Sequence, residues 1–254
     1  QHFLNNEEIL DTTIEIADIS TDDKVIEIGP GPGVLTERLI DTGCELTAIE
    51  IDPVICEFLR DTFPNLNLIH GDALQEKWPK ANKFVANIPY QISSPLIEII
   101  TRTSTIDFVL ILVQEEFAER LVVEWETDKG SLGMCTMLDW DCNIEVRVGS
   151  HCFTPSPKVN SCLVSMSRIK SPQNSKLAKL LIRQAFEQRR KKIRNTLSKA
   201  PKRISRVSKW HSKLYREAFQ CIDFPLIDCR PEELEIEDWL ELARLLEDAR
   251  AAMG

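Results

Sequence analysis

The stretch KVIEIGPGPGV, residues 24–34, decides the fold. Its β-rich first half, Lys24 to Ile28, leads into three glycines, and Val34 then opens a helical pattern. A strand, a glycine turn and a helix in this order are typical of the nucleotide-binding unit of an α/β domain, because glycine lets the backbone approach a ligand closely. For the glycines taken alone, a plain structural turn is the alternative.

The spacing of the glycines and the acidic residues that follow them indicate which class of ligand the domain binds. Gly31 and Gly33 are two residues apart, whereas a dinucleotide-binding loop leaves three to make room for a pyrophosphate. The form found here occurs in methyltransferases that use S-adenosylmethionine (SAM), which carries no phosphate. Glu50 stands where an acid can accept both ribose hydroxyls. Asp72 is suited to accept from an adenine amino group or to cap the next turn. Together these residues predict a bound nucleoside, without choosing between nicotinamide and SAM.

Short β-rich runs alternate with helical stretches from residue 1 to about residue 166. This rhythm predicts an α/β fold, a Rossmann-like domain with a seven-stranded, mostly parallel sheet. After the polar break 171–174 only helical patterns follow, so we expect a nucleoside-binding α/β domain over residues 1–168 and a small all-helical domain over residues 169–254. The predicted strands are Lys24–Ile28, Glu45–Ile49, Leu66–His70, Lys83–Asn87, Phe108–Val113, Ile144–Val148 and Ser161–Ser167.

Three helix starts can be read from the sequence. Asp52 before Pro53, and Ser94 before Pro95, each place a capping residue ahead of one that needs no amide donor. The last helix is expected to follow residues 230–232 and to run through Trp239 to Leu246.

The most specific motif is the tetrapeptide Asn87-Ile88-Pro89-Tyr90 at the end of the fourth predicted strand. An aromatic amine is a poor nucleophile because its lone pair is delocalised into the ring. Two acceptors that hold both amino hydrogens, here the Asn87 side-chain oxygen and the Ile88 carbonyl, favour a more pyramidal nitrogen. Tyr90 would stack on a flipped base, an interaction worth about 1–3 kcal/mol. An Asn-Pro turn with a buried Tyr is the structural alternative.

Charge is distributed unevenly along the chain. The formal net charge is −9, which by itself argues against a polyanion binder. Residues 168–216, however, hold 17 Lys and Arg and one acid, Glu187. An apolar helical period through Leu181, Phe186 and Leu197 runs within this segment, so we predict a packed basic helical face that binds nucleic acid rather than a merely solvated one.

The remaining composition narrows the class of protein. The eight cysteines contain no C-x-x-C pair, which favours free thiols in a reducing compartment, taken here as the cytoplasm, and argues against a metal site. No apolar run is long enough to span a bilayer, and a membrane partner is not expected. The chain begins with Gln1 instead of Met, which suggests a trimmed chain. A monomer is the default expectation.

Along almost its entire length the chain resembles the small-subunit ribosomal RNA adenine dimethyltransferases, the KsgA-type family. The block Phe153 to Val159 separates this family from generic adenine methyltransferases. The matching stretches are residues 1–4, the glycine loop 27–33, residues 48–52, 71–73 and 87–95, residues 114–121, the block 153–159 (FTPSPKV), and residues 185–191.

The resemblance implies SAM as cofactor and implies roles for individual residues. The implied cofactor-binding residues are His2, Leu4, Gly29, Gly31, Glu50, Ile51, Asp72, Ala73 and Asn87. The implied catalytic residues are Asn87, Ile88, Pro89, Tyr90 and Phe153, with Tyr90 and Phe153 on either side of the target adenine. Arg189, Arg190, Lys191, Lys192 and Arg194 are implied to contact RNA phosphates.

The chain departs from the family pattern at three places. His2 stands where many relatives have Asn, which puts one hydrogen bond to the cofactor in doubt. Residues 130–134 lack the arginine that relatives commonly carry there, and Glu116 is an acid where Lys is frequent.

The implied activity is methyl transfer from SAM to the exocyclic nitrogens of two adjacent adenosines near the 3′ end of small-subunit rRNA, within an immature ribosomal subunit. One alternative is a non-catalytic RNA-binding assembly factor or transcription factor on the same fold. Another is a methyltransferase acting on large-subunit rRNA adenine.

Overall fold

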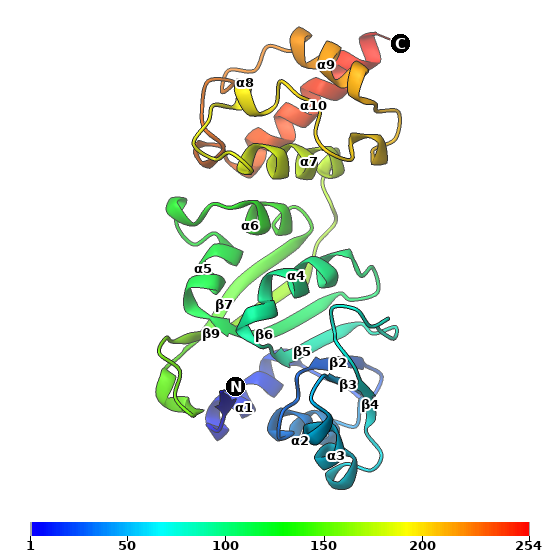
Figure 1. Ribbon diagram of the computed structural model, residues 1–254, viewed down its shortest axis with the longest axis vertical. Coiled ribbons are helices and arrows are strands. Elements are labelled where there is room, and N and C mark those ends of the chain that lie inside the picture. The colour runs from blue at the N-terminus through cyan, green and yellow to red at the C-terminus, as the bar shows by residue number, and fades with distance from the viewer. Residues whose placement is uncertain (1, 254) are drawn as a thin grey trace. The chain divides into compact units, whose positions relative to one another are not determined.

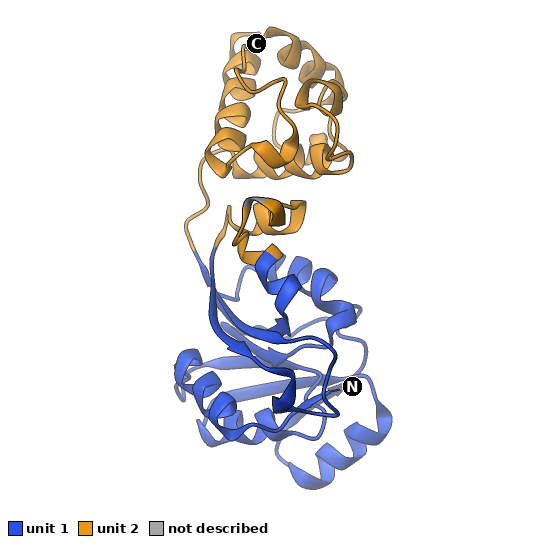
Figure 2. Ribbon diagram, turned by 90° about the vertical axis from the view of Figure 1, so that its left-hand side faces the viewer, with its two compact units in different colours: residues 1–119, 141–168 blue, residues 120–140, 169–254 orange. Residues whose placement is uncertain are grey.

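The structure is a computed structural model that describes residues 2–253, so Gln1 of the first matching stretch lies outside the described residues. The chain forms two compact units, coloured separately in Figure 2. Unit 1 comprises residues 1–119 and 141–168, and unit 2 comprises residues 120–140 and 169–254. The sequence had suggested one continuous domain up to residue 168. Residues 120–140 instead group with the C-terminal helices, because Met134, Cys135 and Leu138 are buried in their core.

Unit 1 is built on a seven-stranded sheet, which confirms the predicted α/β class (Figure 1). Every registered neighbouring pair is parallel except β6 with β9, which run antiparallel. In order across the sheet the strands are β4 (Asn67–His70), β3 (Glu45–Glu50), β2 (Lys24–Ile28), β5 (Lys83–Asn87), β6 (Phe108–Gln114), β9 (Ser161–Arg168) and β7 (Trp140–Val148).

The central strands are apolar on both faces, as expected for a sheet covered by helices. In β6, residues 109–113 are all buried, and in β2 residues 25–28 are buried. The helices that follow the strands in unit 1 leave these runs no access to water (Figure 1). They are α1 (Glu7–Ala17), α2 (Val34–Asp41), α3 (Pro53–Thr62), α4 (Ser93–Arg102) and the start of α5 (Glu115–Val122).

A second, two-stranded sheet was not expected from the sequence. β1 (Phe3–Leu4) pairs antiparallel with β8 (Phe153–Thr154). The Asn5 amide also donates to the Cys152 carbonyl at 3.0 Å. This pairing fixes the N-terminal segment beside residues that lie about 150 positions later in the chain.

The helix starts agree with the sequence only in part. Asp52 caps α3 as predicted, since its side chain accepts from the Val54 amide at 2.8 Å. The predicted cap at Ser94 is wrong, because a 3₁₀ turn, Tyr90–Ile92, precedes α4 and the helix already begins at Ser93. That turn continues directly into the helix, so its backbone replaces a capping side chain.

Apart from Trp140, which begins β7, the regular elements of unit 2 are helical, with Trp239 and Tyr215 fully buried in its core. The last helix follows residues 230–232 and runs through Trp239 to Leu246 as predicted; it begins at Ile236, after a separate 3₁₀ turn, Pro231–Glu233. The helices of unit 2 are α6 (Ser131–Thr136), α7 (Ser175–Phe186), α8 (Ile193–Thr196), α9 (Ser212–Cys221) and α10 (Ile236–Ala252).

The predicted basic helical face forms only in part: α7 carries Lys176, Lys179 and Arg183 and packs its apolar residues in the core, but other bases lie outside helices. Helix α7 ends at Phe186, and residues 187–192 form turns before α8 begins. Arg189 to Lys192 therefore lie on a loop. No helix within residues 2–253 is long and apolar enough to cross a membrane.

Candidate active site

The carboxyl ends of neighbouring parallel strands bring the predicted motifs together at one edge of the sheet. The Gly29 amide, after β2, donates to the Ile49 carbonyl of β3 at 2.9 Å, and the Gly71 amide, after β4, donates to the Glu50 carbonyl at 2.8 Å. The Gly31 amide faces the Glu50 carboxylate at 3.4 Å. Open α/β sheets bind their ligands at this edge.

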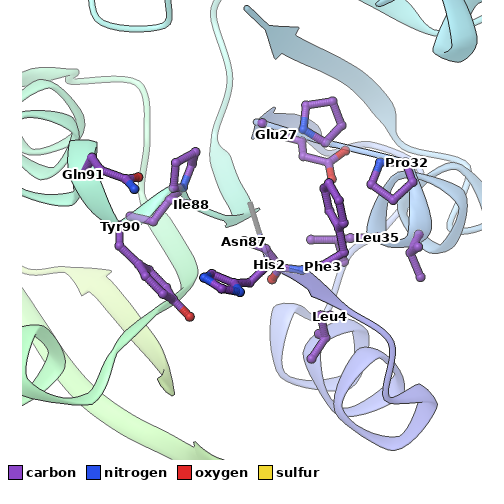
Figure 3. A pocket seen from close by; sticks show the side chains of 14 residues that line it. His2, Phe3, Leu4, Glu27, Pro32, Leu35, Asn87, Ile88, Tyr90 and Gln91 are labelled. Carbon is purple, nitrogen blue, oxygen red and sulfur yellow. The ribbon is translucent and has the colours of Figure 1, made fainter. Parts of the chain in front are cut away.

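A hollow opens beside the glycine loop and the end of β5 (Figure 3). It holds about 790 Å³ with open solvent included. Its lining contains His2, Leu4, Gly29, Asn87, Ile88, Pro89 and Tyr90 from the predicted set, together with Phe3, Glu27, Pro30, Pro32, Val34, Leu35 and Gln91.

The glycine loop needs its glycines at two positions next to the hollow. Gly29 and Gly31 have φ of +66° and +56°, a backbone conformation that L side chains rarely adopt. A Cβ added at Gly31 would lie 2.8 Å from the Phe3 ring, and one at Gly29 would lie 3.3 Å from Pro89. The bare backbone of Gly29 therefore forms part of the pocket wall, and Gly31 lies behind Phe3, which lines it.

Glu27 is a buried acid in the wall of the hollow. Its side chain is 1% exposed, and its Oε2 accepts from the Thr36 hydroxyl at 2.7 Å. Burial raises the pKa of Glu27 to about 8; the hydrogen bond from Thr36 acts in the opposite direction, and the nearby Glu50 raises the pKa further. Glu27 therefore holds a proton near neutral pH in the cofactor-free protein.

This buried acid predicts a pH-dependent stability. Between pH 4.5 and about 8 the folded protein holds a proton on Glu27 that the unfolded chain has released, so stability falls as pH rises through this range. Glu27→Gln should remove up to roughly 5 kcal/mol of that decline, because Gln is neutral at every pH and still accepts from Thr36. The measurement is urea unfolding without SAM at several pH values.

Glu8→Gln is the matched control, since Glu8 is exposed. It should keep the parent pH profile. A Glu27→Gln protein whose unfolding free energy still declines like the parent's would contradict this assignment.

The two predicted nucleoside acceptors are both engaged with their own backbone. Glu50 is 2% exposed, and its Oε1 accepts from the Ile51 and Asp52 amides at 2.8 and 2.9 Å. Asp72 accepts from the Leu74 amide at 2.9 Å, so it adopts the turn-capping role that the sequence left open. Ile51 is 62% exposed, while Ala73 is buried. None of these four residues lines the hollow, although the bond from Gly71 to Glu50 holds the ends of their strands side by side.

Asn87 to Tyr90 leave the sheet at the wall of the hollow, with the Asn87 and Tyr90 side chains half-buried (Figure 3). The Tyr90 hydroxyl is 2.8 Å from the Ser161 hydroxyl, which is fully buried at the start of β9. The His2 ring is stacked on Tyr90 with centroids 6.4 Å apart, and its Nδ1 lies 2.7 Å from the Pro155 carbonyl oxygen. This chain thus places an aromatic ring against Tyr90.

Phe153 does not reach the hollow. It is 5% exposed and belongs to the core cluster that also holds Leu4, its partner across the β1–β8 pair. Its place on the second face of a target base therefore stays a prediction.

The predicted RNA-binding residues are all exposed, but most already have acidic partners within unit 2. The Arg189 guanidinium is 2.8 Å from Glu232, and that of Arg194 is 2.9 Å from Asp228. The Lys192 amine is 3.7 Å from the same Asp228 oxygen. No ion pair of Arg190 or Lys191 is found among the described residues.

Sequence reasoning missed several residues of the wall. Phe3 and Gln91 sit next to predicted positions, so proximity to the motifs was the signal that could have found them. Ser161 lies in the long-range pairing of β9 with β6, for which a local pattern gives no signal. Within residues 2–253 no cluster of His, Cys, Asp or Glu could hold a metal ion, and all eight cysteines are free.

Comparison with known proteins places this arrangement among related chains. The family model described as "Ribosomal RNA adenine dimethylase" matches residues 1–216. Ribosomal RNA small subunit methyltransferase A of Nostoc sp. is 34% identical, over 97% of this chain and 96% of its own length. The probable small subunit methyltransferase A of Thermococcus kodakarensis is 35% identical, over 97% and 88%. The crystal structure of a dimethyladenosine transferase from Plasmodium falciparum is 26% identical with a TM-score of 0.76, over 97% of this chain and 98% of that chain.

Proposed function

Because the chain belongs to the ribosomal RNA adenine dimethylase family, we propose that it methylates the exocyclic nitrogens of two adjacent adenosines near the 3′ end of small-subunit rRNA. One observation carries the proposal. The Asn87–Tyr90 motif and the glycine loop line the same hollow, so a base and a methyl donor can meet there.

The proposal also covers the substrate, the oligomeric state and the cellular compartment. The substrate is the rRNA of an immature small subunit, and the protein acts on it as a monomer. The relatives named as small subunit methyltransferases support the choice of subunit. The free cysteines support a reducing compartment, the cytoplasm.

The residues of the sheet edge fit SAM. The positive-φ glycines leave a bare backbone wall, and buried carboxylates stand at the ends of β2 and β3. When bound, SAM supplies a methyl group activated by a sulfonium. His2, Leu4, Gly29 and Gly31 would cover it, and Glu50, Ile51, Asp72 and Ala73 would hold its nucleoside.

The chain's own residues then orient the target base. The Asn87 side-chain oxygen and the Ile88 carbonyl accept the two amino hydrogens, while Pro89 keeps this turn extended. The Tyr90 ring stacks on the adenine, with Phe153 as the second aromatic face. Such positioning can lower the activation barrier of methyl transfer by roughly 7–11 kcal/mol. No general base is needed before the new nitrogen–carbon bond forms.

The second methylation sets a further condition on this pocket. A monomethylated amine retains one hydrogen, so one of the two acceptors still holds it while the other faces the new methyl group.

Ser161 should contribute by holding Tyr90. Removing the hydrogen bond by Ser161→Ala or by Tyr90→Phe should lower kcat/KM for rRNA about 2- to 10-fold, the value of one neutral hydrogen bond. The double variant should lose no more than either single variant, and Ser161→Thr should restore most of the loss. Steady-state kinetics of all four proteins test this. Losses that add in the double variant would contradict a shared role.

The function itself is tested by incubating immature small subunits with labelled SAM and mapping dimethyladenosine by mass spectrometry. Label at two adjacent adenosines near the 3′ end supports the proposal. Label confined to large-subunit RNA or DNA, or RNA binding without any label, would replace it with the corresponding alternative.

A further inference from the structure

A second basic segment of unit 2, residues 199–210, joins α8 to α9 and is called here the basic connector. Its exposed cations are Lys199, Lys202, Arg203, Arg206 and Lys209. The sequence grouped these residues with all other bases of the segment 168–216. None of them lines the hollow of the active site.

The basic connector is anchored to the core of unit 2 at every third residue. Ile204 and Trp210 are 3% and 4% exposed, and Val207 packs against the same core. The Val207 amide donates to the Ile204 carbonyl at 3.0 Å, and the Trp210 amide donates to the Val207 carbonyl at 3.2 Å. The Trp210 indole also donates to Glu247 at 2.5 Å. These contacts fix the course of the backbone.

The cations follow the same spacing, one residue earlier. Arg203, Arg206 and Lys209 are exposed, while the residue after each of them faces the core. The Arg206 amide donates to the Arg203 carbonyl at 2.9 Å within the 3₁₀ turn Ile204–Arg206, whereas Val207 is extended and Arg203 and Lys209 have positive φ. The three exposed cations, each directly before a residue that faces the core, are called here the stripe.

The stripe differs in its charge balance from residues 189–194, which comprise the turn before α8 and the first two residues of α8 and are called here the loop 189–194. No ion pair of Arg203, Arg206, Lys209 or Lys199 is found within residues 2–253, and of the basic connector only Lys202 is paired, with Glu187 at 2.9 Å. In the loop, Arg189, Lys192 and Arg194 are paired with Glu232 and Asp228.

This difference decides which cations an RNA can use. Phosphate binding gains free energy mainly by releasing counterions from the nucleic acid, in proportion to the phosphates neutralised. A cation that is already paired with a carboxylate must first leave it, and the carboxylate then repels the phosphate. An unpaired cation on a fixed backbone meets neither cost.

We propose that Arg203, Arg206 and Lys209, extended by Lys199, form the main phosphate-binding stripe of unit 2 and seat the sugar–phosphate backbone of the substrate RNA. The inference rests on the proposed function, since it takes rRNA as the ligand. The loop 189–194 then contributes mainly through Arg190 and Lys191.

The test compares two triple variants with the same loss of charge. One is Arg203→Gln, Arg206→Gln, Lys209→Gln, and the other is Arg189→Gln, Lys192→Gln, Arg194→Gln. The affinity of each full-length protein for a small-subunit rRNA 3′ fragment is measured at several salt concentrations. Thermal unfolding midpoints confirm that both variants are folded.

The stripe variant should lower the slope of log affinity against log salt by about 2–3, since each lost phosphate contact removes about 0.7–0.9. The loop variant should lower it by less than half as much. A stripe variant with the parent slope, or a loop variant with the larger change, overturns the inference.

The two proposals fail in different ways. A parent protein that binds the fragment but transfers no label from SAM to immature small subunits contradicts the proposed function and leaves the stripe to be judged by the slopes. A parent that transfers label, with a stripe variant that binds at the parent affinity and slope, contradicts the stripe alone.

Discussion

Asn87→Ala is expected to lower the turnover of rRNA methylation about 10²- to 10³-fold, with only a small loss of RNA affinity. The magnitude is that of removing one preorganised polar group from an active site. Asn87 ends β5 and lines the hollow, so its side-chain oxygen is available to a target amine. RNA affinity should change little, because it depends mainly on the cations of unit 2.

The measurement is single-turnover product formation, with monomethyl- and dimethyladenosine separated by mass spectrometry. Asn65→Ala is the control, since Asn65 is exposed in the turn before β4, and it should keep the parent rate. Product formation by Asn87→Ala near the control rate would remove Asn87 from the proposed chemistry. A parallel loss in both variants would indicate a general effect on the fold.

Gly31→Ala is expected to weaken SAM binding by about 10-fold or more. An L residue at φ +56° costs roughly 1–2 kcal/mol, and the new Cβ would lie 2.8 Å from the Phe3 ring. Phe3 lines the hollow and is held by β8, so its displacement disturbs the wall of the cofactor site.

Isothermal titration with SAM measures this effect. Gly130→Ala is the matched control, because its φ is −149° and the nearest atom to an added Cβ is 3.7 Å away. It should bind SAM like the parent. Equal affinities for the two alanine variants would show that the Gly31 conformation does not matter for the cofactor.

The sequence predicted the elements that depend on neighbouring residues. The glycines after β2, the cap at Asp52 and the apolar run of β6 each follow from short-range rules of turns, caps and burial. Their order then predicted the sheet and brought the ends of β2, β3 and β5 to one edge.

What the sequence missed depends on contacts between distant residues. Two residues are too few to show a strand period, so the β1–β8 pair had no signal. The cap expected at Ser94 failed because the Tyr90–Ile92 turn runs into the helix. The loop 189–194 has the composition of a phosphate site, but its acidic partners Asp228 and Glu232 lie some 40 positions further on.

The division of the chain has a consequence for dissecting it. Residues 120–140 belong to unit 2 although both of their ends continue into unit 1, so the chain passes between the units three times. A truncation after Arg168 would leave Met134, Cys135 and Leu138 without the core that buries them. The exposed apolar surface should promote aggregation. The helical unit therefore cannot be removed, or exchanged between relatives, as a single terminal cassette; a clean exchange must carry the internal segment with it.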